Sequence, residues 1–330
     1  MLFSRSQLAD LGFYGPRPGV KMAQGNVYNA LLYQGNTSSE IDNISTGNGN
    51  DIVIGNDVYN HITLGNGSDS VTAGAAGAYI VCGTGTDTIN TGTAACVIKG
   101  GTGTAILDYS GLSGYLIVDL QNGTVDKPGA QDAVTNVQVF DGGSGGNAFK
   151  SIDIGDYTFN GQGYSIATYN GQVGANTLDY SADANGVTIN LATDTVTKGI
   201  AYISWQSGAV HWQDSFSDIQ NFVGSGSGNT TFKGIGTFGY TFTGHGTSNT
   251  LDYSADANGV TINLATDTVK KDLDYFNLHS GAVYWQDSFS DIENFVGGGS
   301  GSTSFKSIGT GDYTFNGQGG NNTLVLFRRC

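Results

Sequence analysis

Residues 47–53 read GNGNDIV, and the same short pattern returns as GNGSDSV at 65–71, GTGTDTI at 83–89 and GTGTAIL at 101–107. The first glycines of these copies stand at positions 47, 65, 83 and 101, so the interval between copies is constant. A fixed short period indicates a repeat architecture, in which each repeat is one structural unit that stacks on its neighbours. The repeat therefore indicates the fold class, whatever the helix or strand propensities of single residues.

Each interval divides into two equal halves, and each half carries apolar residues suited to a short strand. Because side chains alternate along a strand, the apolar residue two places after each Asp is expected to point inward. The second halves carry a matching apolar column. The two columns are Val53, Val71 and Ile89, and Ile62, Ile80 and Ile98. We predict an all-β chain: a parallel β-solenoid rod, of the β-roll or β-helix type, with an irregular N-terminal cap.

The repeated G-x-G-x-D-x-U pattern resembles the RTX (repeat-in-toxin, haemolysin-type) calcium-binding repeat, whose fuller form is G-G-x-G-x-D-x-U-x. In that family Ca²⁺ lies between stacked loops and is held by an Asp carboxylate from one coil and backbone carbonyls from the next. The resemblance therefore implies a Ca²⁺ cofactor. Carried over, the metal residues would be Asp51, Asp69 and Asp87, with loop carbonyls around Gly47, Gly49, Gly65, Gly67, Gly83 and Gly85.

The chain departs from the RTX pattern in several places. The leading glycine is replaced by Thr46, Leu64 and Cys82 in the first three copies and is present only as Gly100. The fourth copy has Ala105 where the Asp belongs. The alternate halves lack the motif, so calcium is expected along one edge of the solenoid only. The alternative is a metal-free solenoid with solvated Asp and Asn turns.

Charge gives an independent reason to expect a cation at this edge. No Lys or Arg occurs between Lys21 and Lys99, although several Asp fall in that span. Stacking Asp over Asp at the strand spacing of about 4.8 Å brings like charges together. This arrangement is unfavourable unless a positive charge neutralises it, and hard oxygen ligands favour Ca²⁺.

Composition narrows the class of protein. The 330 residues include 53 Gly and only 3 Pro and carry a net charge of −15, almost all of it from Asp. Little helix is expected, and without a basic patch we expect no nucleic-acid partner. We find no transmembrane segment and no N-terminal signal peptide. The RTX resemblance implies an extracellular or cell-surface location reached without such a signal. Of the three cysteines, Cys82 and Cys96 are expected in the core, and Cys330 is left unassigned.

A second, longer repeat follows the first. Residues 176–196 read NTLDYSADANGVTINLATDTV, and residues 249–269 repeat them without a change. These units also resemble segments that flank RTX repeats in large bacterial surface proteins. We expect six segments: a cap or assembly segment at 1–45, the RTX-like β-roll at 46–105, a diverged long repeat at 106–175, long repeats at 176–248 and 249–321, and an unfinished repeat at 322–330.

No catalytic residues are assigned. G-x-S-x-G occurs at 142–146, but it lies in a Gly/Ser loop without a strand-to-helix context. The carboxylate pairs Asp214 with Asp218 and Asp287 with Asp291 could in principle cleave a polysaccharide. They recur in both long repeats, which suits repeated structure better than one active site. The aromatics Trp212, Trp285, Tyr180 and Tyr253 either bind sugar rings or pack between coils, and packing is the preferred interpretation.

Three functions remain open. The sequence favours a calcium-binding structural or adhesive protein of the bacterial surface or extracellular matrix, not an enzyme, with self-association and a surface polysaccharide as candidate partners. The alternative is a polysaccharide-active enzyme or its noncatalytic module. The third is an ice-binding protein, because Thr84, Thr86, Thr102 and Thr104 form short threonine rows.

Overall fold

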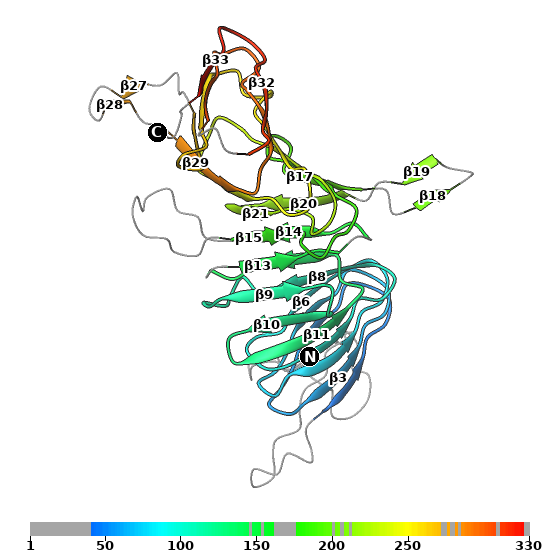
Figure 1. The fold of residues 1–330 in the computed structure, drawn as a ribbon. Coiled ribbons are helices and arrows are strands. Elements are labelled where there is room, and N and C mark those ends of the chain that lie inside the picture. The colour runs from blue at the N-terminus through cyan, green and yellow to red at the C-terminus, as the bar shows by residue number, and fades with distance from the viewer. Residues whose placement is uncertain are drawn as a thin grey trace, which may run out of the picture. The chain divides into compact units, whose positions relative to one another are not determined.

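The computed structural model describes residues 41–144, 147–152, 155–161, 176–199, 202–204, 208–210, 213–271, 276–277, 281–282, 285–307 and 311–326. Every regular element in these ranges is a β-strand, and most strands pair in parallel (Figure 1). The chain forms two compact units, divided near residue 145. The expected N-terminal cap, apart from residues 41–45, and Cys330 lie outside the described residues. Within the residues that the structure describes, no helix has the length and apolarity that a membrane crossing needs.

The first unit is built from coils that match the short sequence repeat, and each coil contributes one strand to each of two sheets. One sheet contains β1 (Asn43–Ser45), β3 (Asn60–Thr63), β5 (Ala78–Val81) and β7 (Val97–Lys99). The other contains β2 (Ile52–Ile54), β4 (Ser70–Thr72), β6 (Thr86–Asn90) and β8 (Thr104–Asp108). Successive strands pair in parallel with partners exactly one repeat apart, as in Ile62 with Ile80 and Val53 with Val71. The sequence period is therefore the register of the solenoid.

The predicted inward columns form the core of this unit. Ile62, Ile80 and Ile98 are completely buried, and so are Val53, Val71 and Ile89 to within 2%. Cys82 and Cys96 are buried beside them as free thiols, as expected. The apolar columns thus supply a continuous core in which each coil packs on the next.

Antiparallel hairpins interrupt the parallel coils, which the sequence analysis did not foresee. In the first unit β9 (Leu116–Asp119) is followed by β10 (Thr124–Lys127) and β11 (Ala130–Thr135), and β12 (Val139–Asp141) returns to the other sheet. β10 and β11 pair in antiparallel fashion, and β11 also pairs in parallel with β7. The reason is local: Pro128 and Gly129, the latter with φ of 88°, make a two-residue turn that reverses the chain.

The second unit contains the long repeats. Its first strands are β13 (Asn147–Lys150), β14 (Thr158–Asn160), β15 (Thr177–Asp179), β16 (Val187–Asn190), β17 (Thr195–Lys198), β20 (Gln213–Ser217), β21 (Asn221–Val223), β22 (Thr230–Lys233) and β23 (Thr241–Thr243). The next copy supplies β24 (Thr250–Asp252), β25 (Val260–Asn263), β26 (Thr268–Lys271), β29 (Trp285–Ser290), β30 (Asn294–Val296), β31 (Ser304–Ser307), β32 (Thr314–Asn316) and β33 (Thr323–Leu326). Two small hairpins, β18 (Tyr202–Ser204) with β19 (Gly208–Val210) and β27 (Phe276–Asn277) with β28 (Gly281–Ala282), follow β17 and β26.

Equivalent strands of the two copies lie in opposite sheets of the second unit. β15 belongs to one sheet and its counterpart β24 to the other, and the same exchange holds for β16 and β25. This happens because one repeat contains an odd number of half-coils. Near-identical sequences therefore present their outward residues on alternating faces.

Phenylalanine columns form much of the core of the second unit. Phe222 stacks on Phe242 with ring centroids 6.0 Å apart and an interplanar angle of 19°. The next copy repeats this with Phe295 and Phe315 at 5.9 Å and 19°. Both pairs are direct parallel partners, so the strand register itself aligns the rings.

Close backbone approach leaves no room for a side chain at one glycine of the repeat, while another glycine has open space beside it. A Cβ at Gly65 would overlap the carbonyl oxygen of Gly47 in the coil below, whereas a Cβ at Gly47 would meet nothing within 4 Å.

We expect Gly65→Ala to lower the free energy of unfolding by about 1–3 kcal/mol. The matched Gly47→Ala variant should change it by less than about 0.5 kcal/mol. Urea unfolding followed by circular dichroism checks both, and equal effects would contradict the coil spacing.

Candidate functional site

The predicted metal residues lie along one edge of the first unit, where loops of successive coils stack. Asp51 and Asp69 directly precede the strands β2 and β4, and Asp87 lies within β6. The loops themselves pair through parallel bridges from Asn48 to Asn66 and from Asn66 to Thr84. The structure thus brings the three Asp into one column at the register of the repeat.

Two of the three carboxylates in this column, those of Asp69 and Asp87, accept hydrogen bonds from backbone N–H groups of a neighbouring coil or of their own loop. The backbone N–H of Asp51 donates to Oδ1 of Asp69 at 2.7 Å, and that of Asp69 donates to Oδ1 of Asp87 at 3.1 Å. Oδ2 of Asp87 accepts from the N–H of Gly83 at 3.1 Å. Asp69 and Asp87 are only 2% and 1% exposed. Asp69 and Asp87 are therefore buried carboxylates held by backbone donors, and the partly buried Asp51 continues the column.

Two oxygens of the column stay unsatisfied. Oδ2 of Asp51 and Oδ2 of Asp69 are buried and have no hydrogen-bond partner. Burying a carboxylate oxygen without a donor or a positive charge costs free energy. Because no Lys or Arg occurs in this part of the sequence, a bound cation is the partner that best fits these atoms.

The glycine loops offer carbonyl oxygens beside the carboxylates. The carbonyls of Gly47 and Gly65 accept hydrogen bonds from the N–H groups of Asn66 and Thr84 at 3.1 and 3.2 Å, and each keeps a second lone pair. The second glycine of each loop is in the left-handed region, with φ of 123° at Gly49, 124° at Gly67 and 94° at Gly85. In the described residues no three His, Cys, Asp or Glu side chains converge as a metal site. A cation here would therefore take most of its ligands from carbonyls, which suits a hard ion such as Ca²⁺.

Burial also shifts acid–base behaviour at this edge. Burial raises the pKa of Asp87, against the lowering effect of the N–H donors of Asp69 and Gly83, and the charge of Asp69 raises it further. Burial and the neighbouring Asp87 and Asp69 charges raise the pKa of the Cys82 thiol to about 12. Cys82 is therefore a core residue and not a reactive thiolate.

A scan against protein-family models finds no match for this chain, and a search of curated proteins finds none either. The RTX resemblance thus rests on the motif and its spacing.

One carboxylate of each pair considered for polysaccharide cleavage is poorly placed for it. Asp214 and Asp287 are completely buried, and each forms an ion pair with a buried lysine. Tyr180 and Tyr253 are also completely buried, so they pack in the core and cannot stack on a sugar. Trp285 is half-buried, and Trp212 lies outside the described residues.

A surface hollow of about 300 Å³ in the second unit was not foreseen from the sequence. Its lining includes Asp194, Asp218, Phe238 and Tyr240. Burial raises the pKa of Asp194, and the charge of Asp218 raises it further. The next copy of the long repeat has Gly311 at the position equivalent to Phe238, so this aromatic wall differs between the two repeats.

The threonine rows are exposed but short. Thr84, Thr86, Thr102 and Thr104 all face solvent, and Thr86 pairs directly with Thr104. The Thr84 hydroxyl donates to the Asn66 side chain at 2.9 Å, so Asn continues the row in the coil below. The rows span two coils, as the sequence indicates.

The Asp87 shift predicts a pH dependence in calcium-free buffer. The pKa of Asp87 is higher in the folded protein than in the unfolded chain, so the folded protein binds this proton more tightly. The contribution of Asp87 to stability is therefore present at low pH and is lost as the pH rises through the folded pKa. We therefore expect the urea midpoint of the wild type, relative to that of Asp87→Ala, to rise as the pH is lowered from 7 toward 4. A difference that is constant or falls with acidification would contradict a buried, desolvated Asp87.

Proposed function

We propose that this chain is a calcium-binding structural or adhesive protein of the bacterial surface or extracellular matrix. The observation that carries the proposal is the buried Oδ2 of Asp69. This oxygen has no hydrogen-bond partner, and it lies in a column of acidic side chains. A single Ca²⁺ between coils would neutralise neighbouring carboxylates and use the adjacent glycine carbonyls. Coil stacking and ion binding would then stabilise each other.

The mechanism is coupled folding. In the absence of calcium the Asp column destabilises the stacked coils, because like charges are held close together away from water. An ion that binds only the folded form stabilises it by mass action, by about 2.7 kcal/mol at a concentration 100 times Kd. In an extracellular setting, where calcium is abundant, the chain would fold outside the cell.

Calcium titration of an EGTA-stripped sample tests this mechanism. We expect the thermal unfolding midpoint and the β-signal in circular dichroism to rise with Ca²⁺ and to respond much less to Mg²⁺. Asp69→Ala should abolish most of the response. Asp57→Ala removes the same charge from an exposed position outside the motif and should retain it. An equal calcium response in both variants, or none in the wild type, would overturn the proposal.

Self-association is the second part of the proposal. Among the described residues, β33 ends one sheet of the second unit, and Leu324 and Leu326 on it are 51% and 66% exposed. β2 ends a sheet of the first unit, with Ile52 at 55% exposed. Strands at the edge of a sheet that expose apolar side chains are templates for strand addition, which would join copies end to end. A surface polysaccharide is the further candidate partner.

The hollow beside Phe238 favours a second candidate function, that of a noncatalytic polysaccharide-binding module. A sugar ring could stack on Phe238 or Tyr240 while Asp194 and Asp218 accept hydrogen bonds from its hydroxyls. Phe238→Gly copies the residue of the next repeat and should weaken binding of soluble alginate or pectin fragments at least tenfold in calorimetry. Thr243→Ala, outside the hollow, is the control. Identical affinities, or no binding by the wild type, would remove this candidate, and turnover of these polymers would favour the enzyme alternative.

A further inference from the structure

In the part of the chain that the structure describes, three buried lysines each contact a buried aspartate and share it with a buried tyrosine. In each centre the lysine ends one strand of an antiparallel pair and the aspartate lies on the partner strand, while the tyrosine follows another strand. The centres are Lys127–Asp132–Tyr109, Lys198–Asp214–Tyr180 and Lys271–Asp287–Tyr253. The Lys and Asp side chains of all three centres have no exposed surface.

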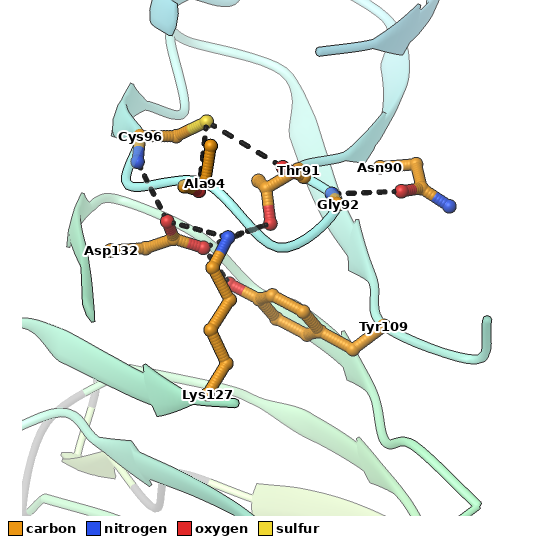
Figure 2. A network of polar contacts seen from close by, with 8 residues as sticks. All are labelled: Asn90, Thr91, Gly92, Ala94, Cys96, Tyr109, Lys127 and Asp132. Atoms are coloured by element: carbon orange, nitrogen blue, oxygen red, sulfur yellow. Dashed lines mark hydrogen bonds and ion pairs between the residues drawn. The ribbon is translucent and has the colours of Figure 1, made fainter. Parts of the chain in front are cut away.

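The first centre lies in the first unit (Figure 2). Lys127 Nζ is 2.9 Å from Oδ1 of Asp132 and donates to the Thr91 hydroxyl at 2.7 Å. The hydroxyls of Thr91 and Tyr109 both donate to Oδ2 of Asp132 at 2.9 Å. The backbone N–H of Cys96 donates to Oδ1 at 2.7 Å. The amine therefore faces one carboxylate oxygen while two hydroxyls hold the other.

The second centre repeats this geometry in the second unit. Lys198 Nζ is 2.7 Å from Oδ1 of Asp214, whose Oδ2 accepts from Tyr180 at 2.6 Å and from Ser151 at 2.8 Å. The N–H of Tyr157 donates to Oδ1 at 3.0 Å. Ser151 thus donates the hydrogen bond to Oδ2 that Thr91 donates in the first centre.

The third centre keeps the amine, the carboxylate and the tyrosine. Lys271 Nζ is 2.7 Å from Oδ1 of Asp287, Tyr253 donates to Oδ2, and the N–H of Tyr240 donates to Oδ1 at 2.9 Å. The residues FKSI at 149–152 correspond to FKGI at 232–235, so Gly234 stands where the second centre has the Ser151 hydroxyl. The three centres therefore form a natural series with and without the second hydroxyl.

We propose that each buried Lys–Asp pair condenses into an intramolecular isopeptide bond. The Lys ammonium passes one proton to Oδ1 of the Asp, and the neutral amine then attacks Cγ. A tetrahedral intermediate forms with its negative charge on Oδ2, where the tyrosine O–H donates. The nitrogen loses a second proton to Oδ1, which leaves as water. One C–N bond forms, one C–O bond breaks, and the only by-product is a water molecule, so no oxidant or cofactor is needed.

In the second and third centres burial favours the neutral carboxyl that this step needs, and in the third it also favours the neutral amine. Burial raises the pKa of the Asp214 and Asp287 carboxyls against the opposing influence of their lysines, and it lowers the pKa of the Lys271 amine. Burial and the Asp charge raise the pKa of Tyr109, Tyr180 and Tyr253 well above 10, so the phenols remain donors. An ion pair without access to water is costly to keep charged, and amide formation removes that cost.

The proximity of the amine and the carboxylate also favours amide formation. The fold holds the amine and the carboxylate in contact, which replaces a bimolecular encounter by an intramolecular one. Exclusion of water protects the amide from hydrolysis. Each bond would join two paired strands covalently, which stabilises the folded chain against unfolding and pulling. This chemistry does not depend on calcium and stands apart from the proposed function.

Intact mass spectrometry of the full-length chain, unfolded in denaturant after purification in the folded state, decides the matter. Each amide lowers the mass by one water, about 18 Da, so three bonds lower it by about 54 Da. An ion pair leaves the mass unchanged. Trypsin should also fail to cut after Lys198 and Lys271, and fragmentation should yield branched peptides joining each Lys to its Asp. The full sequence mass in protein with a native β-spectrum would overturn the proposal. A water loss that mild alkali reverses would indicate succinimide instead and would equally overturn it.

Variants assign the bonds to their centres. Lys198→Arg keeps the charge but cannot form the amide, so the mass deficit should fall by one water beyond the change of residue. Lys150→Arg is the matched control: Lys150 pairs with Asp119 at 3.7 Å with side chains 41% and 15% exposed, and this pair should stay uncrosslinked. Tyr180→Phe should slow closure of its centre during refolding, as followed by mass against time. The third centre, with Gly234, should close more slowly than the second. If Lys198→Arg does not fold, the wild-type mass and branched peptides still decide.

Discussion

In-register stacking of parallel coils is the constraint from which the chemistry of this protein follows. The register of the short repeat places every side chain of a coil in the first unit above its counterpart in the next coil. For Ile80 and its neighbours this is favourable, because apolar side chains bury surface against identical ones. For Asp69 it is unfavourable, because carboxylates are brought together and buried. The same geometry that builds the core thus creates an edge where carboxylates are stacked and buried.

In the hairpins the strands do not pair at the register of the repeat, so a different set of side chains meets in the core. Where β10 turns back into β11, and β17 pairs with β20, antiparallel pairing brings side chains together that are not related by the repeat. A lysine and an aspartate then meet in the core. A buried ion pair costs desolvation energy unless its remaining atoms are satisfied, and here hydroxyl and backbone donors surround each carboxylate. The centres at Lys127 and Lys198 share this donor set, two hydroxyls and one backbone N–H, although the segments that join the paired strands differ in length.

The long repeats add a symmetry that bears on interaction surfaces. Because one repeat spans an odd number of half-coils, β20 and its copy β29 lie in opposite sheets. Any surface feature shared by the two copies therefore recurs on opposite sheets. The substitution of Gly311 for Phe238 makes the hollow in the first copy different from the matching position in the second.

The sequence by itself determined the period, the solenoid class, the inward columns and the Asp column, because a strict repeat fixes register and register fixes which residues share a face. It did not reveal the hairpins. Lys198, Asp214 and Tyr180 recur in the next copy, and this recurrence of polar residues in strands was the available signal. Only the tertiary structure brought them into contact and showed that Asp214 is buried. The physical reason is that periodicity reports neighbours related by the repeat, whereas a chain reversal joins residues at separations that no period encodes.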